Sequence, residues 1–220
     1  MKILITCDDV WHPAEVIEKG LDFLKKEGHE LHFIKDAKDI LTPEYIRRYP
    51  LWINAKMDQI GSFNQHVWFE EGIAELGVRD AEAYVQNGGG VLALHAGCSY
   101  FLNASAEYCR LLGCAFVKHP PRCPVTVRPV SAHPITSGVT EFTLRDEHYE
   151  IELLAEDAKI ILQSTSESGG TQTAGYVRQL GKGRICALTP GHILSVFDHP
   201  MYQKIIRQAV LWAAGEESIL

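Results

Sequence analysis

Three residues that can transfer protons or bind metal lie directly after apolar runs of the sequence. His95 follows the run at 91–94, Glu147 lies in the segment Asp-Glu-His-Tyr at 146–149, and His192 follows the run at 184–188. An imidazole carries protons near neutral pH, and a carboxylate acts as a base or orients an imidazole. Two histidines and a glutamate also suit a divalent metal. Because the three residues are far apart in the chain, their spacing does not decide between proton transfer and metal binding.

His95 stands at a predicted strand-to-helix turn. Glycines 88–90 precede the apolar run, and Ala96, Gly97 and Cys98 follow His95. Open parallel sheets bind ligands beyond the carboxyl ends of their strands, and the N-terminus of a following helix can hold an anion or a developing oxyanion. We therefore expect His95 and Gly97 in a binding site. The alternative is a structural histidine that fills the turn.

The other two candidates are predicted to face the same edge. Period-two alternation sends Glu147 and Tyr149 to one side of their strand and Asp146 and His148 to the other. We expect Glu147 to face the site with Tyr149, although an exposed acidic strand end is the competing interpretation. His192 follows Gly191, which allows a close backbone approach or a positive φ.

The elements that must position these residues form an α/β pattern. The first apolar run, a helix opened by Pro13 and capped by Gly28, and a second strand make a βαβ unit. Strand-like segments with period-two alternation follow Pro120 and Pro121, and residues 180–183 indicate a hairpin turn. The predicted strands are 1–7, 29–36, 51–55, 91–95, 124–130, 142–151, 159–165, 173–180 and 183–190; the predicted helices are 13–28, 66–76, 78–87, 99–112 and 200–214.

This order predicts a single doubly wound α/β domain over residues 1–220, with a mostly parallel sheet and a late antiparallel extension.

The net charge of −7 argues against nucleic-acid binding. The absence of an apolar run of 18 residues argues against a membrane span, and no signal peptide is recognisable. The six cysteines lack metal-binding spacing, which favours the reducing cytoplasm. Trp52, Trp68 and Phe69 are either core residues or a surface for a partner, such as a second copy of the chain.

Four segments together resemble the trehalose-utilisation (ThuA-like) family. They are GGGVLALHAG, HPITSGV with FTLRDEHYEI, GKGRICALTPGH, and a closing helix that ends VLWAAG. The resemblance covers essentially the whole chain. It implies the flavodoxin-like, three-layer fold of the class I glutamine amidotransferases and a cytoplasmic role in carbohydrate metabolism. It also implies a substrate among oxidised (keto) sugars or glycosides.

His95 stands where those amidotransferases have their nucleophilic cysteine in G-x-C-x-G. Cys98 lies about one helical turn later and is expected to point elsewhere, so glutaminase activity is not expected. Our leading hypothesis is an acid–base enzyme, a lyase, hydrolase or isomerase, that acts on a keto sugar through His95, Glu147 and His192. No cofactor is certain, and a divalent metal held by these same residues stays open. The alternative is a non-catalytic sugar-binding or interaction module. A nucleotide-binding role lacks a G-x-G-x-x-G or phosphate-loop motif.

Further candidates lie after the first strand and at scattered histidines. Asp8 and Asp9 are expected to reach the cleft, although Asp9 could instead cap a helix. In the following loop, with His12, an aromatic residue such as Trp11 could stack on a sugar ring. His119 is expected at the edge of the cleft and His133 in a turn. The remaining histidines are assigned to the surface or to packing: His29, His32, His66 and His199.

Overall fold

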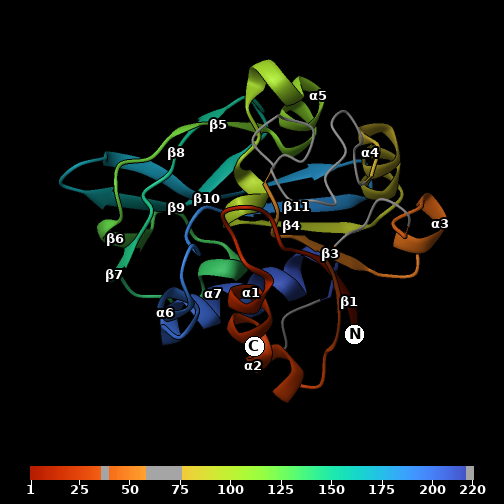
Figure 1. The fold of residues 1–220 in the computed structure, drawn as a ribbon, viewed down its shortest axis with the longest axis horizontal. Helices are drawn as coiled ribbons and strands as arrows, with labels where there is room; N and C mark the ends of the chain where they lie inside the picture. Colours follow the sequence, from red (N-terminus) through yellow and green to blue (C-terminus); the bar gives the residue numbers. More distant parts are fainter. Residues whose placement is uncertain (36–39, 58–75, 217–220) are drawn as a thin grey trace.

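The structure, a computed structural model, describes residues 1–35, 40–57 and 76–216. Its centre is a nine-stranded mixed sheet (Figure 1). The strands are β1 (Lys2–Thr6), β2 (Glu30–Ile34), β3 (Leu51–Asn54), β4 (Gly90–Leu94), β6 (Cys123–Pro129), β7 (Phe142–Asp146), β9 (Lys159–Ser166), β10 (Gly170–Leu180) and β11 (Gly183–Leu188). Their order across the sheet is β2-β1-β3-β4-β11-β10-β9-β6-β7. Neighbouring strands from β2 to β11 pair in parallel, and those beyond β11 pair antiparallel, which confirms the predicted extension.

Helices cover both faces of the parallel part of the sheet (Figure 1). On one face Ile3 and Ile5 pack in a core with the last helix, and on the other face Leu4 packs with Trp52 and Tyr84. Strands with two buried faces are expected to be continuously apolar, as observed in β4. The predicted three-layer α/β sandwich is therefore confirmed. The helices are α1 (Ala14–Gly20), α2 (Asp22–Lys26), α3 (Pro43–Ile46), α4 (Val78–Gln86), α5 (Leu102–Leu112), α6 (Leu194–Phe197) and α7 (Pro200–Ala213).

The hairpin predicted at 180–183 is present. Leu180 pairs with Gly183, so only Gly181 and Lys182 form the turn between β10 and β11. Gly181 has a φ of 61°, a conformation that glycine adopts without steric cost. The turn reverses the chain and starts the antiparallel half of the sheet.

The single helix predicted from Pro13 to Gly28 is wrong. The chain forms α1 and α2, with a break at Leu21, whose φ and ψ are −98° and 3°. Pro13 is extended and precedes α1. A Cβ atom on Gly20 would lie 2.5 Å from the ring of Phe197. The end of α1 therefore accommodates α6 at a distance that only glycine permits, a contact that the helical spacing could not reveal.

The single strand predicted at 142–151 is also wrong. β7 ends at Asp146, and the chain continues into β8 (Glu150–Leu153). β8 leaves the main sheet and pairs antiparallel with β5 (Cys114–Lys118), a strand that the sequence analysis did not predict. Residues 147–149 therefore cross between two sheets. The short helix α3 was not predicted either.

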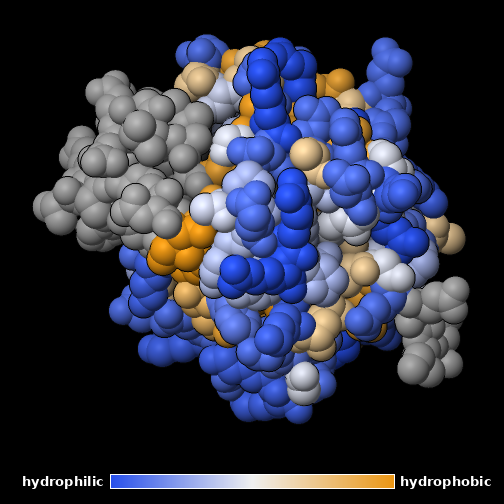
Figure 2. Space-filling model, turned by 90° about the vertical axis from the view of Figure 1, so that its right-hand side faces the viewer, coloured by the Kyte–Doolittle hydropathy of each residue, from blue (hydrophilic) through white to orange (hydrophobic). Residues whose placement is uncertain are grey.

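Trp52 belongs to the core and not to a partner surface. It is 4% exposed, and its indole N–H donates to Thr6 Oγ1 at 2.9 Å. Trp68, Phe69, His66 and most of the helix predicted at 66–76 lie outside the described residues. Figure 2 shows that the face on the right-hand side of Figure 1 is mostly hydrophilic with scattered apolar residues. Within the described ranges, no helix combines the length and apolarity needed to cross a membrane.

Candidate functional site

His95 occupies a strained turn at the carboxyl end of the central strand β4. Its backbone φ is 46°, which a residue with a side chain rarely adopts. The next residues form a single 3-10 turn, η1 (His95–Cys98), and α5 begins only at Leu102. The helix N-terminus predicted behind His95 is therefore one short turn. The strained conformation matches the elbow that presents the nucleophile in many α/β enzymes, here with a histidine in that place.

Gly97 and Gly191 allow the backbone to close around His95. A Cβ atom on Gly97 would lie 1.9 Å from the carbonyl oxygen of Asn54 at the end of β3. Gly191 has a φ of 136°, and a Cβ atom there would lie 3.1 Å from Cβ of His95. The close approach predicted at Gly191 is confirmed. Gly97 packs against β3, so packing explains this glycine better than the substrate contact we predicted.

The side chain of His95 is fixed by its neighbours. It is 1% exposed, and its ring stacks on Tyr149 with centroids 4.3 Å apart. Its Nδ1 atom lies 2.7 Å from the carbonyl oxygen of Thr189. Because a carbonyl only accepts hydrogen bonds, Nδ1 carries the proton and Nε2 of the neutral ring keeps its lone pair. Burial lowers the pKa of His95 and favours this neutral form.

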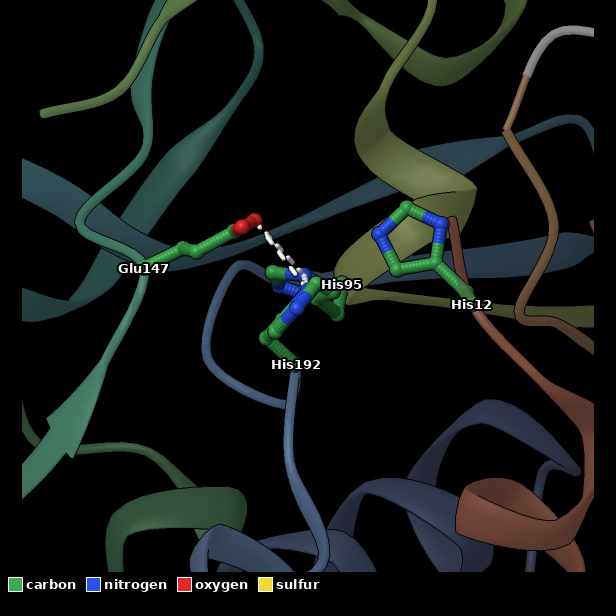
Figure 3. A group of neighbouring side chains, drawn as sticks. All are labelled: His12, His95, Glu147 and His192. Carbon is green, nitrogen blue, oxygen red and sulfur yellow. Dashed lines mark hydrogen bonds and ion pairs between the residues drawn. The ribbon is translucent and has the colours of Figure 1, made fainter. Parts of the chain in front are cut away.

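Nε2 of His95 points at Glu147 and His192 (Figure 3). It lies 3.5 Å from Oε2 of Glu147 and 3.3 Å from Nδ1 of His192, and this nitrogen of His192 lies 3.2 Å from the same oxygen. The structure thus brings the three predicted residues together. Burial would raise the pKa of Glu147, but the adjacent imidazoles of His192 and His95 outweigh it and lower the pKa, so the carboxylate stays ionised.

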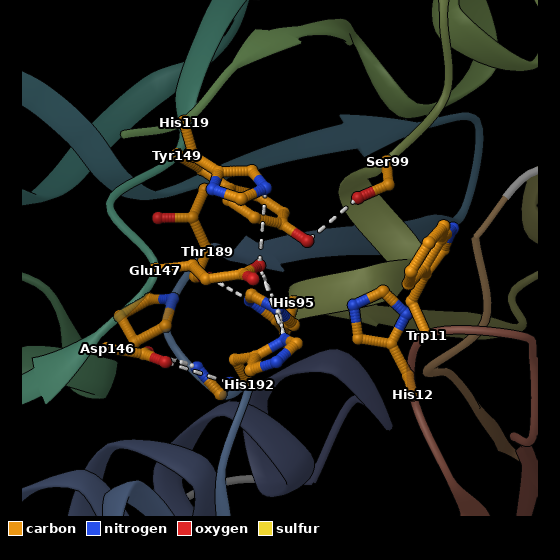
Figure 4. A network of polar contacts seen from close by, with 12 residues as sticks. Trp11, His12, His95, Ser99, His119, Asp146, Glu147, Tyr149, Thr189 and His192 are labelled. Atoms are coloured by element: carbon orange, nitrogen blue, oxygen red, sulfur yellow. Dashed lines mark hydrogen bonds and ion pairs between the residues drawn. The ribbon is translucent and has the colours of Figure 1, made fainter. Parts of the chain in front are cut away.

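Asp146 positions the loop that carries His192. Its carboxylate accepts hydrogen bonds from the backbone N–H of Gly191 at 2.7 Å and of His192 at 3.0 Å (Figure 4). Burial raises the pKa of Asp146, while these hydrogen bonds and His95 oppose the rise. Period-two alternation predicted Asp146 on the side away from the site, without a role there. Asp146 instead connects β7 to the loop after β11.

The side chains of Glu147 and Tyr149 lie on the same side, as predicted, although β7 ends before these residues. Both face His95, whereas His148 is buried beneath β9, where its ring nitrogens lie 2.9 Å and 2.6 Å from the hydroxyls of Ser164 and Ser166. The hydroxyl of Ser99 donates to Tyr149 at 3.0 Å. Extended backbone alternates its side chains even where no partner strand is present.

His12 completes the cluster and was not among the predicted catalytic or metal-binding residues. Its ring lies 5.1 Å from that of His95 and 5.2 Å from that of His192, measured between centroids. The carboxylate of Asp9 lies 2.8 Å from Nδ1 of His12, so Nδ1–H is the donor. Nε2 is buried and has no hydrogen-bond partner among the described residues. The spacing Asp9-x-x-His12 after a parallel strand was the available signal.

Asp8 and Asp9 act on their own loop. Asp8 has a φ of 79°, and its carboxylate accepts from the backbone N–H of Ala14 at 3.0 Å. Asp8 therefore takes the helix-capping role considered for Asp9. Asp9 is 2% exposed; burial would raise the pKa of its carboxyl, but the hydrogen bond from His12 and backbone donors lowers it. Neither aspartate lines the pocket, so the direct substrate contact predicted for them is not supported.

The cluster opens into a pocket of about 480 Å³, within the size range of small-molecule sites. Trp11, 63% exposed, stands at this pocket, and Tyr149 and His119 line it as predicted. Nε2 of His119 lies 3.6 Å from Oε2 of Glu147. A larger open hollow of about 950 Å³ over the outer strands has no such cluster among its described lining residues. The lining residues of the smaller pocket are Trp11, His12, Met57, Ser99, Phe101, Phe116, His119, Arg122, Glu147, Tyr149 and His192.

Cys98 points away from this pocket, as expected. It is completely buried, and its Sγ atom lies 3.6 Å from the carbonyl oxygen of Ala93 and 3.8 Å from that of Leu188. Burial raises the pKa of this thiol well above its usual value, which suppresses the nucleophilic thiolate. Cys98 therefore does not replace the amidotransferase nucleophile.

The other described histidines have local roles. Nδ1 of His133 accepts from the backbone N–H of Ile135 in the predicted turn, and Nδ1 of His199 accepts from that of Met201 at the start of α7. His32 contacts Glu30 at 2.6 Å, and His29 lies beside the amino terminus. These contacts agree with the predicted surface and packing roles.

Comparisons with known proteins place the chain in a family. A crystal structure of a ThuA-like protein from Bacteroides uniformis has a TM-score of 0.75 at 20% sequence identity. The match covers 99% of this chain and 93% of the Bacteroides chain. A cytoplasmic protein from Salmonella typhimurium has a TM-score of 0.64 at 14% sequence identity. The match covers 96% of this chain and 98% of the Salmonella chain. A glutamine amidotransferase from Thermotoga maritima has a TM-score of 0.62 at 12% sequence identity, and the match covers 97% of this chain and 98% of the amidotransferase chain. The two proteins therefore share the amidotransferase-like fold. No curated protein matches the sequence. The ThuA family model, described as trehalose utilisation, matches residues 4–213, and the chain belongs to this family.

Proposed function

We propose that this protein is an enzyme that moves a proton at a ring carbon next to a ketone in an oxidised sugar or glycoside. The convergence of His95, Glu147 and His192 at one end of a pocket carries the proposal. The family description, trehalose utilisation, supports a sugar as the substrate.

The pocket suits a sugar ring. Trp11 and Phe116 offer aromatic surfaces on which the C–H face of a sugar can stack. Ser99 and Arg122 offer polar groups for hydroxyls. A mostly apolar wall with a few polar groups is the usual composition of a small-molecule site.

Proton transfer next to a ketone would explain why bases line this pocket. The ketone acidifies the neighbouring C–H, and a base removes that proton to give an enolate. When the enolate collapses, the bond to an oxygen substituent on the next carbon breaks, and a proton converts the departing oxygen to an alcohol. The products are an unsaturated ketone and an alcohol, so no oxidant or reductant is consumed. Neutral imidazoles and the ionised Glu147 supply groups that accept and return the proton.

Two hydrolytic mechanisms fit the pocket less well than this elimination. Glutaminase chemistry needs an accessible thiolate, and Cys98 is buried in the core. Direct glycoside hydrolysis commonly uses two carboxyl groups that flank the bond. Glu147 is the sole carboxylate among the described residues that line the pocket.

The test compares p-nitrophenyl glucoside with the same glucoside oxidised to a ketone at ring carbon 3. We expect nitrophenol release from the ketone only, and a fall of roughly 100-fold or more in kcat/KM in Glu147→Gln. The matched control is Glu150→Gln, which changes a carboxylate three residues away at the start of β8. Equal turnover of both glucosides, or full activity of Glu147→Gln, contradicts the proposal. Binding of the ketone without turnover favours the non-catalytic sugar-binding module instead.

A further inference from the structure

The side chains around His95 present electron pairs to one another. Thr189 fixes the proton of His95 on Nδ1, and Asp9 fixes that of His12 on Nδ1. In the neutral form of either ring, Nε2 is therefore an acceptor. The carboxylate of Glu147 is also an acceptor, and it lies 3.5 Å from Nε2 of His95. Acceptors that converge in a buried place repel one another unless a proton or a metal cation lies between them.

We propose that His12, His95, Glu147 and His192 bind one divalent transition-metal ion. One ligand atom from each of the four residues lies within 4.8 Å of the others (Figure 3). Nε2 of His12 is buried without a partner in residues 1–35, 40–57 and 76–216, which is an independent sign of a ligand, because a buried nitrogen normally finds a partner. The catalytic use of the ion rests on the function proposed above, whereas its binding does not.

The distances fit a metal polyhedron. Tetrahedral ligands at about 2.0–2.1 Å from a zinc ion lie about 3.4 Å from one another. The three separations among His95 Nε2, His192 Nδ1 and Glu147 Oε2 are 3.2, 3.3 and 3.5 Å. His12 approaches from the opposite side of the cluster, on the loop after β1 (Figure 3). Its ligand atom, the fourth, lies within 4.8 Å of the other three.

The surrounding contacts are those that metal ligands need. A ligating histidine usually donates its second N–H to a carboxylate or a backbone carbonyl, which fixes the tautomer and the ring orientation. Asp9 does this for His12 and the carbonyl of Thr189 does it for His95. Asp146 holds the backbone of His192. A residue outside the four ligands therefore holds each histidine in position.

The ligand types select the class of ion. Imidazole nitrogens favour zinc and other late first-row metals, whereas magnesium and calcium prefer oxygen ligands. Three neutral imidazoles and one carboxylate leave a net charge of about +1 on a bound divalent ion. His12, Glu147 and His192 line the pocket, so the ion faces it. A substrate ketone could then coordinate the ion, which would stabilise the enolate oxygen. His119, beside Glu147 and outside the four ligands, is the imidazole left to carry the proton.

The binding test uses the full chain, stripped of metal by a chelator and titrated with Zn²⁺ in competition with a chromophoric chelator. We expect one Zn²⁺ per chain, no competition by millimolar Mg²⁺, and affinity lowered by at least about 10-fold in His12→Gln. His119→Gln is the matched control because it removes a neighbouring histidine that is not a ligand, and it should bind Zn²⁺ as the wild type does. His192→Gln, which changes a ligand on a different loop, repeats the test if His12→Gln does not fold. Absence of stoichiometric binding, or wild-type affinity in the folded ligand variants, overturns the proposal.

A second measurement separates metal binding from the proposed reaction. The stripped protein and the Zn²⁺-, Mn²⁺- and Co²⁺-loaded forms are assayed on the oxidised p-nitrophenyl glucoside. Activity that appears only with metal supports both the site and its catalytic use. Stoichiometric binding without turnover by any form supports the site and contradicts the proposed function. Equal turnover by the stripped and loaded forms keeps the proposed function and overturns the catalytic use of the ion.

Discussion

The carboxylate of Asp9 lies 2.8 Å from Nδ1 of His12 and fixes the orientation of the ring. Nε2 of His12 is therefore buried next to His95 and His192, without a hydrogen-bond partner in the described part of the chain. The same carboxylate accepts from the backbone N–H of Met57 at 2.9 Å. Asp9 therefore joins the loop after β1 to the end of β3 while it fixes the His12 tautomer. A residue that neither lines the pocket nor touches the other histidines thus controls the direction of one imidazole.

Asp9→Asn should weaken Zn²⁺ binding by about 10- to 100-fold, the usual effect of removing a carboxylate behind a histidine ligand. The amide keeps the shape of the side chain but offers one acceptor oxygen instead of two. Competition titration measures the affinity, and circular dichroism checks the fold. Asp8→Asn is the control, because Asp8 caps α1 and does not contact His12. Equal losses in both variants point to a general disturbance of the loop and contradict the specific role of Asp9.

Asp146→Asn should lower the free energy of unfolding by roughly 1–3 kcal/mol, since a buried carboxylate that accepts two backbone hydrogen bonds becomes an amide with one acceptor. Its kcat on the oxidised glucoside should fall as well, because the loop that carries His192 loses its anchor. Urea denaturation gives the free energy. Glu141→Gln, at an exposed position before β7, should change it by less than about 0.5 kcal/mol. An Asp146→Asn variant as stable and active as the wild type argues against this positioning role.

Trp11→Ala should raise KM for the oxidised glucoside by about 3- to 10-fold and leave kcat and Zn²⁺ affinity unchanged. Trp11 is 63% exposed at the pocket and is not among the clustered ligands, so its loss removes a stacking surface and no reacting group. Steady-state kinetics separates the two constants. Trp11→Phe retains an aromatic face and should recover most of the loss. A fall in kcat at constant KM indicates that Trp11 does more than bind.

Native protein should expose one rapidly reacting thiol to a disulfide reagent. Of the six cysteines, Cys123 is partly exposed and the other five are buried. Burial also raises the pKa of Cys114 to about 11, so thiolate is scarce in the core near neutral pH. Absorbance of the released thiolate counts the fast and slow groups before and after unfolding. Cys123→Ser should abolish the fast phase; a fast phase that persists and maps to Cys98 restores a candidate nucleophile.

The sequence by itself determined the α/β class, the parallel strands and the antiparallel extension. Buried parallel strands such as β4 are continuously apolar, and period-two alternation marks the later strands, so local patterns carry this information. Because the carboxyl ends of parallel strands meet at one edge, the sequence also indicated that His95, Glu147 and His192 share a site. Alternation placed Glu147 and Tyr149 on one side, although β7 and β8 belong to different sheets.

Only the tertiary structure decided the details that depend on contacts between distant segments. Phe197 against Gly20 marks where α1 ends, the β5–β8 pair removes residues 150–153 from the main sheet, and Asn54 accounts for Gly97. His12 could not be ranked above the other histidines, because its importance comes from Asp9 on one side and His95 on the other. A tautomer, an unpaired nitrogen and a ligand distance are properties of an arrangement in space, and residue spacing in the chain does not encode them.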